Sequence, residues 1–199
     1  MAVNNYYQDL ADSINYEDIN EWQIPDINHF SDKKKLFPYQ AEALKNTAKL
    51  LKTFFLSSDG KKELYRFCIS NGMVDNFSVQ KYLKPVDERK GITNPRFELL
   101  SEYYGINGVN NTIDGVHFFN RCAYWMATAS GKTIVLIKVI EYISYLKKNS
   151  LIPDYDIMLL IPKDNLLEQF KEQVDEYNNS RNPNSRIEIV SLKDYDSDK

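Results

Sequence analysis

The sequence has little of what metal sites and disulfide scaffolds require. Its 199 residues include only two histidines and two cysteines, and His29, His117, Cys68 and Cys122 are far apart along the chain. Ligands scattered in this way match no zinc-site spacing, and two thiols make at most one disulfide. We therefore expect no metal centre built from these side chains, and two ordinary thiols in a reducing, cytoplasmic compartment.

Long apolar runs and a strong charge of either sign are also missing. No window approaches the roughly 18 consecutive apolar residues of a membrane span, and the start MAVNNYYQDL has no basic region followed by an apolar run. We expect a soluble, uncleaved protein with no membrane partner. Since the formal net charge is only −3, any binding to nucleic acid must rely on a local basic groove.

The chain does have enough apolar residues to form a core, and they are unevenly distributed along the sequence. Hydrophobic residues make up 43% of it. Residues 1–35 are polar and acidic with scattered aromatics, which predicts an N-terminal arm with one short helix. Residues 36–56 carry an apolar stripe behind Pro38, which predicts a helix. Residues 57–116 have several turn signals and no clean period, so we interpret them as a mainly helical insertion.

From residue 117 onwards the pattern becomes regular. Short apolar runs alternate with longer segments of helical period, and this rhythm predicts an α/β fold with a parallel sheet and flanking helices. The expected order is a strand at 118–126, a helix at 132–148, a strand at 157–161, a helix at 164–177 and a strand at 187–192.

Between the first strand and the first helix stands "AYWMATASGKT", residues 123–133. The pattern is that of a P-loop, G-x-x-x-x-G-K-[ST], with Met126 at the first glycine and Ala129 at a position that often carries another. Both substitutions keep a backbone N–H, so the loop can still donate to phosphates. Gly131, Lys132 and Thr133 are intact, with Lys132 suited to the β and γ phosphates and the Thr133 hydroxyl to Mg²⁺.

The segment "HFFNRCAYWMATASGKT" resembles motif I of superfamily 2 helicases, above all the ATPase subunits of type III and type I restriction enzymes, where loops of the form MAT-x-x-GKT are usual. The resemblance implies a partial RecA-like P-loop domain that uses ATP and Mg²⁺ and acts on DNA. It places cofactor contacts at Thr128, Ala129, Ser130 and Gly131, and gives Lys132 and Thr133 both cofactor-binding and catalytic roles. Residues 36–56 and 117–199 would form this first motor domain.

Two further segments fit the same family in the same order. "LFPYQAEAL", residues 36–44, resembles the motif in which a glutamine reads adenine, which gives that role to Gln40 with Tyr39 beside it. "MLLIPKDNLLEQF", residues 158–170, resembles motif Ia, in which Pro162 and Lys163 would contact a DNA backbone. The alternatives are a solvent-facing glutamine at a helix start and an ordinary turn before a helix.

The Asp-Glu pair with which the family holds Mg²⁺ and polarises water is missing after Leu160, where only "SLKDYDSDK" provides acidic residues. We therefore expect the truncated, ATP-binding N-terminal part of a DNA translocase, inactive alone. A second interpretation is a nucleotide-binding module that docks a methyltransferase, nuclease or specificity subunit. A third is a small P-loop phosphotransferase, which the scattered arginines disfavour.

Overall fold

The computed structural model describes residues 5–56, 59–73, 76–78, 84–87, 90–104, 112–115, 123–124, 126–127 and 129–191. The chain divides into two compact units. One comprises Met1–Leu10 and Ser57–Ala123, and the other Ala11–Leu56 and Tyr124–Lys199. The second unit contains both segments that the sequence assigns to the nucleotide site.

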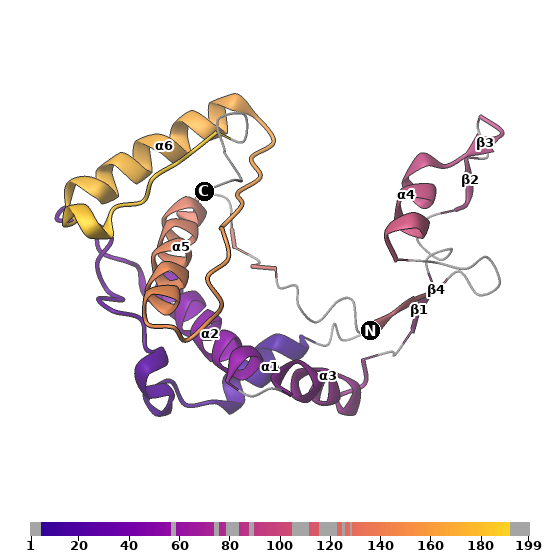
Figure 1. Ribbon diagram of the computed structural model, residues 1–199, viewed down its shortest axis with the longest axis horizontal. Coiled ribbons are helices and arrows are strands. Elements are labelled where there is room, and N and C mark those ends of the chain that lie inside the picture. Colours follow the sequence, from indigo (N-terminus) through magenta and orange to yellow (C-terminus); the bar gives the residue numbers. More distant parts are fainter. Residues whose placement is uncertain are drawn as a thin grey trace. The chain divides into compact units, whose positions relative to one another are not determined.

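Helices dominate this second unit (Figure 1). It holds the 3₁₀ helix η1 (Tyr16–Trp22), the helices α2 (Pro38–Phe55), α5 (Lys132–Lys148) and α6 (Asp164–Asn179), and the short 3₁₀ helix η3 (Pro183–Ser185). Helix α1 (Tyr6–Ser13) ends inside it. Pro38 occupies the first turn of α2, where its missing N–H costs nothing, and Leu44 and Ala48 of that helix are buried.

The main hydrophobic core joins α2, α5 and residues that precede α2. Leu44 and Ala48 pack with Val135, Tyr142 and Leu146 of α5. Ile19, Trp22 and Ile24 belong to the same cluster, and the Tyr142 hydroxyl donates a hydrogen bond to the carbonyl of Trp22 at 2.5 Å. The prediction set residues 1–35 apart as an arm, whereas in the structure residues 11–35 share a compact unit with α2 and α5.

A second cluster attaches α6 to the other side of α5. Phe30 and Ile137 pack there with Phe170, Val174 and Tyr177, all of them buried. The three α6 residues recur every four and then three positions, so they form one apolar stripe, and most of the other residues of the helix are polar. Helix α5 therefore lies in contact with both hydrophobic clusters.

A buried charge network reinforces the position of α5. Lys138 is completely buried, forms an ion pair with Glu141 one turn later, and donates to the backbone carbonyl of Asp26 at 3.3 Å. The Nε of Arg181 lies 3.5 Å from the other carboxylate oxygen of Glu141. Because a buried ammonium group requires such partners, this network fixes the rotation of α5 about its axis.

The helices match the sequence-based predictions, whereas the strands stay predictions. Helices α2, α5 and α6 lie where the apolar periods predicted them, and α5 has the predicted bounds. The predicted strand at 118–126 falls mostly outside the described residues. Residues 157–161 and 187–191 are described and belong to no helix or strand. A strand requires a hydrogen-bonded neighbour, which a period in the sequence cannot supply. The parallel sheet stays a prediction.

The other unit consists of short elements. It contains the helices α3 (Gly60–Ser70) and α4 (Pro95–Tyr104), both within the range that the sequence suggested as a mainly helical insertion. Strand β1 (Asn76–Ser78) pairs with β4 (Thr112–Asp114), and β2 (Val86–Asp87) pairs with β3 (Ile92–Thr93), both antiparallel. Among its described residues, Phe97 and Ile113 form a small buried cluster.

None of the helices in the described part of the chain is both long enough and apolar enough to cross a membrane.

Candidate nucleotide site

The first turn of α2 and the loop before α5 meet although they are some ninety residues apart in the sequence. The Gln40 side chain donates from Nε2 to the carbonyl oxygen of Ser130 at 2.9 Å. The Tyr39 hydroxyl donates to the same oxygen at 3.0 Å. A carbonyl oxygen has two lone pairs, so this one is fully used by the two side chains. The contacts join both parts of the predicted nucleotide site.

The Gln40 side chain is itself fixed by burial and by a hydrogen bond. Only 2% of its surface is exposed, and its Oε1 accepts a hydrogen bond from the backbone N–H of Phe37 at 2.8 Å. This bond satisfies a donor at the beginning of α2 that the helix itself cannot satisfy. One amide hydrogen and one carbonyl lone pair of Gln40 are left over by the hydrogen bonds of the described residues.

The loop turns on two residues with left-handed backbone conformations. Gly131 has φ of +75° and Ala129 has φ of +61°. A Cβ added at Gly131 would overlap Nε2 of Gln40, so that side chain would have to move, and the positive φ of Gly131 also favours glycine there. Ala129 is exposed and has room for its methyl group, but its positive φ gives a physical reason why a glycine is the more usual residue at that position.

The residues beyond the turn are arranged for an anion. Lys132 and Thr133 form the first turn of α5, whose seventeen residues end in Lys147 and Lys148. The unpaired N–H groups and the dipole at such an N-terminus attract phosphate. Lys132 is exposed, and its Nζ donates to the carbonyl of Ala127 at 3.1 Å, so the ammonium group lies along the loop.

The Ser130 hydroxyl is a second sign of a polar ligand. Its Oγ is buried and has no hydrogen-bond partner among the described residues. A buried hydroxyl without a partner is costly, which indicates that the loop is shaped to hold a further polar group. The residues present therefore fit a phosphate. Thr128, the remaining predicted member of the loop, lies outside the described residues.

The sequence interpretation did not single out Phe37, which is prominent in the structure. Its ring is 61% exposed and stacks on the Tyr39 ring, with centroids 5.7 Å apart and planes inclined by 11°. Neither ring belongs to either of the two hydrophobic clusters described above. The signal was available in the sequence as an aromatic residue on each side of a helix-starting proline.

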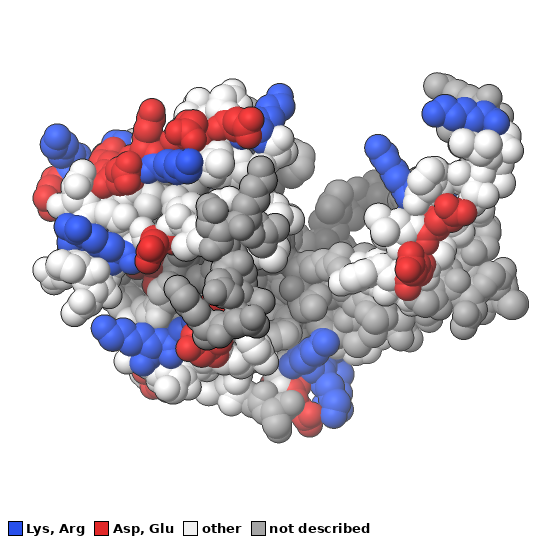
Figure 2. Space-filling view, turned by 45° about the horizontal axis from the view of Figure 1, so that its top comes forward, with Lys and Arg blue, Asp and Glu red and all other residues white. Residues whose placement is uncertain are grey.

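The predicted DNA-contact residues are accessible. Pro162 and Lys163 are both exposed, and Lys163 precedes the first residue of α6, where its carbonyl accepts the N–H groups of Leu166 and Leu167. The exposed surface of the helix that follows is acidic (Figure 2). Its exposed carboxylates belong to Asp164, Glu168, Glu172 and Asp175. A nucleic-acid backbone at this turn would therefore meet Lys163 and not the body of α6.

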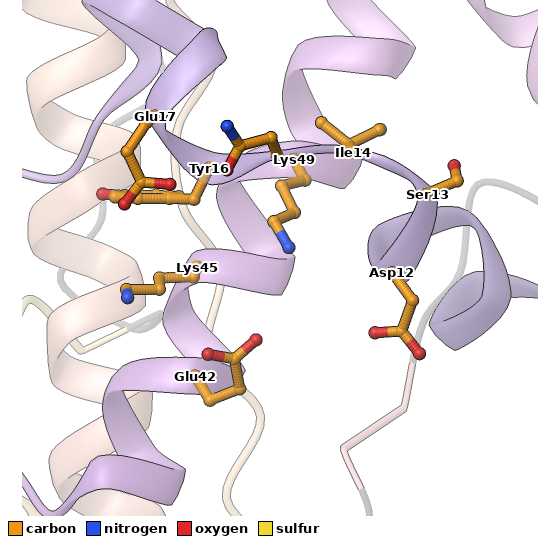
Figure 3. Close-up of a pocket in the computed structure, with 9 residues that line it drawn as sticks. Asp12, Ser13, Ile14, Tyr16, Glu17, Glu42, Lys45 and Lys49 are labelled. Carbon is orange, nitrogen blue, oxygen red and sulfur yellow. The ribbon is translucent and has the colours of Figure 1, made fainter.

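A polar cavity lies elsewhere along α2 (Figure 3). It has a volume of about 430 Å³ and is open to solvent, and none of the predicted nucleotide-site residues lines it. Three carboxylates and two ammonium groups surround it, from Asp12, Glu17, Glu42, Lys45 and Lys49. Charges of both signs give it no preference for phosphate. Within the described residues no group of three histidine, cysteine or carboxylate side chains is placed to hold a metal ion.

Comparison with known proteins gives one match. The family model described as "Type III restriction enzyme, res subunit" matches residues 33–199. This range includes α2, the phosphate loop, α5 and α6, and also the segment that the sequence suggested as an insertion. No curated protein and no solved structure matches the chain.

Proposed function

Because this chain belongs to the type III restriction enzyme res subunit family, we propose that it binds ATP at the junction of α2 and α5, for a motor that moves along DNA. The single observation that carries the proposal is the pair of hydrogen bonds from Tyr39 and Gln40 to the carbonyl of Ser130. These bonds join a residue fit to recognise adenine to a loop fit to bind phosphates.

In this proposal the chain binds the nucleotide mainly through the phosphates of the nucleotide. The N–H groups of the loop and of the first turn of α5 donate to phosphate oxygens, assisted by the helix dipole. Lys132 leaves the carbonyl of Ala127 and pairs with the β and γ phosphates, which offer a full negative charge in its place. The Thr133 hydroxyl would hold the accompanying Mg²⁺, and that ion would neutralise phosphate charge.

Gln40 contributes the preference for adenine. Its remaining amide hydrogen and lone pair form a donor and acceptor pair, which matches the N7 and N6 positions of adenine. Replacement of Gln40 by alanine is then expected to narrow the affinity difference between ATP and GTP. An unchanged ratio would limit Gln40 to holding the loop.

The proposed architecture around this site is a parallel sheet flanked by helices. Two observations support it. Leu159, Ile161 and Ile187 pack against the cluster between α5 and α6, while Met158 and Leu160 are 71% and 82% exposed. An extended segment that is apolar on both faces, with one face packed on helices, is typical of a strand from a parallel sheet. Pro162 and Lys163 would follow such a strand and contact the DNA backbone.

The proposal is tested by replacing Lys132 with alanine and measuring ATP binding by calorimetry in the presence of Mg²⁺. Loss of one charge-assisted phosphate contact is expected to weaken binding about a hundredfold, which corresponds to roughly 2–3 kcal/mol. Replacement of Lys148, an exposed lysine at the other end of α5, removes the same charge and serves as the matched control. Equal affinity of the Lys132→Ala variant and the unchanged protein would refute the phosphate site.

A further inference from the structure

The polar cavity beside α2 contains a buried ammonium group that has no carboxylate partner among the described residues. This group belongs to Lys49, which is only 7% exposed. Its Nζ donates to the backbone carbonyl of Ala11 at 3.0 Å and to Oδ1 of Asn46 at 3.5 Å, and both of these oxygens are neutral. An ammonium group has three hydrogens, so the described residues leave one of them over. Figure 3 shows the Lys49 ammonium group pointing into the cavity, where a ligand could accept this hydrogen.

A carboxylate in the same cavity also has no ion pair. Glu42 and Lys45 lie three positions apart on α2, which is close enough for an ion pair between neighbouring turns. The Nζ of Lys45 lies instead over the Tyr16 ring, 5.3 Å from its centre. No ion pair between described residues involves Glu42, and its side chain is exposed. The Glu42 carboxylate is therefore accessible to a positively charged group of a ligand.

The combination of charges narrows the class of ligand. A metal ion is disfavoured, because within the described part of the chain no three suitable side chains are grouped to hold one. A phosphate is disfavoured as well, because the carboxylates that line the cavity outnumber the ammonium groups. A ligand with a single charge would satisfy either Lys49 or Glu42 and leave the other without a partner. A ligand that carries a carboxylate and an ammonium group satisfies both.

We propose that this cavity binds a small zwitterion, an amino acid whose carboxylate lies at Lys49 and whose ammonium group lies at Glu42. The two residues are seven positions apart, a rise of about 10 Å along α2, so several methylene groups should separate the two charges of the ligand. The cavity volume of about 430 Å³ is within the usual range of small-molecule sites. The proposal does not depend on the proposed function, since none of the nucleotide-site residues lines the cavity.

The test titrates the protein with 6-aminohexanoate at neutral pH and low ionic strength and follows binding by NMR chemical shifts. Glycine has the same two charges but is too short to reach both side chains, and hexanoate and hexylamine carry one charge each. We expect millimolar binding of 6-aminohexanoate and roughly fivefold weaker binding of the other compounds, because each charge pair near the surface contributes little. The affinity should fall as salt is added, since such pairs are screened.

Variants of the two charged residues locate the ligand. Glu42→Gln keeps the size of the side chain and removes its charge, so it is expected to weaken 6-aminohexanoate about fivefold and to leave hexanoate unchanged. Glu172→Gln is the matched control, because Glu172 is exposed on α6. Lys49→Gln should weaken both 6-aminohexanoate and hexanoate, and thermal unfolding shows whether this variant keeps its fold. If it does not, the comparison of Glu42→Gln with Glu172→Gln still decides the question.

Three results would overturn the proposal. If 6-aminohexanoate does not bind, or if hexanoate or hexylamine binds as tightly, the cavity is not a zwitterion site. If Glu42→Gln and Glu172→Gln weaken binding equally, the ammonium group of the ligand does not lie at Glu42. Saturating ATP with Mg²⁺ should not compete with 6-aminohexanoate, and competition would place this ligand at the nucleotide site. A failure of ATP binding would refute the proposed function and leave the zwitterion site standing.

Discussion

Helices α5 and α6 begin in the same sequence context, an apolar run followed by a turn. In the structure, however, the two turns are held by different contacts. At the start of α5, two side chains from α2 hold the carbonyl of Ser130, and Gly131 is confined by Gln40. At the start of α6, Pro162 and Lys163 are exposed, and the hydrogen bonds to Lys163 come from its own helix.

The two turns differ in how far their backbone is ordered before a ligand binds. The α5 turn is fixed by residues far away in the sequence, so its amides are positioned before a ligand arrives. At the α6 turn, the hydrogen bonds between described residues are local. A rigid turn suits a small, highly charged ligand with defined geometry, and an accessible one suits a long polyanion met at changing positions. Substitutions at the first turn should therefore be the more damaging.

The largest expected effect comes from Gly131→Ala. An alanine at φ of +75° is strained by about 1–2 kcal/mol, and its methyl group displaces the Gln40 amide, which costs roughly another 1 kcal/mol for each hydrogen bond lost. We expect a loss of about 2–4 kcal/mol in the free energy of unfolding, measured by denaturant titration. In a Gln40→Ala background the same substitution should cost only the backbone strain. Equal costs in both backgrounds would show that Gln40 does not confine Gly131.

Lys163→Ala tests the α6 turn. If Lys163 contacts one phosphate, its loss should weaken DNA binding several-fold and reduce the slope of log K against log salt by about 0.9. The free energy of unfolding should change by less than about 0.5 kcal/mol, because the side chain is exposed. Lys171→Ala is the control, since Lys171 pairs with Glu168 inside the acidic surface of α6. An unchanged salt slope for Lys163→Ala would leave this turn without a role in DNA binding.

A smaller effect concerns the far end of α6. The Lys34 ammonium group hydrogen-bonds Glu176 at 2.5 Å and, with a further bond from Ser31, lowers the pKa of the Glu176 carboxyl. A lowered pKa in the folded state stabilises the protein above the unfolded pKa, and this stability is lost as the pH falls through the folded pKa. Both side chains are partly exposed, so the contribution is below about 1 kcal/mol.

Glu176→Gln should therefore show a smaller loss of unfolding free energy between neutral pH and about pH 3, measured by denaturant titration at each pH. Glu172→Gln, on the same helix and with no ion pair to a described residue, should keep the loss of the unchanged protein. If both variants behaved alike, the contact between residues 31–34 and α6 would contribute nothing measurable.

The smallest effect is expected for Ala129→Gly. Glycine relieves the strain of a positive φ, but it also gives the unfolded chain more freedom to lose, and these terms of about 1 kcal/mol each oppose one another. The free energy of unfolding should stay within about 0.5 kcal/mol, in contrast to Gly131→Ala. A destabilisation above about 1 kcal/mol would show that the Ala129 methyl group makes a favourable contact.

The local pattern of apolar residues was enough to predict the helices. Helix α5 has the bounds that its apolar period predicted, and α2 begins at the predicted proline. A helix satisfies its own backbone hydrogen bonds, so its sequence carries nearly all the information that it requires. Gly131, Lys132 and Thr133 were also identified from sequence, because the spacing of a phosphate loop is local.

The contacts between residues far apart in the sequence were decided by the tertiary structure alone. It placed Gln40 and Tyr39 on the carbonyl of Ser130, brought Trp22 into the core with Tyr142, and left Phe37 exposed beside the loop. A contact between distant segments, like a strand pair, depends on both partners, whereas a period or a motif in the sequence describes only one of them.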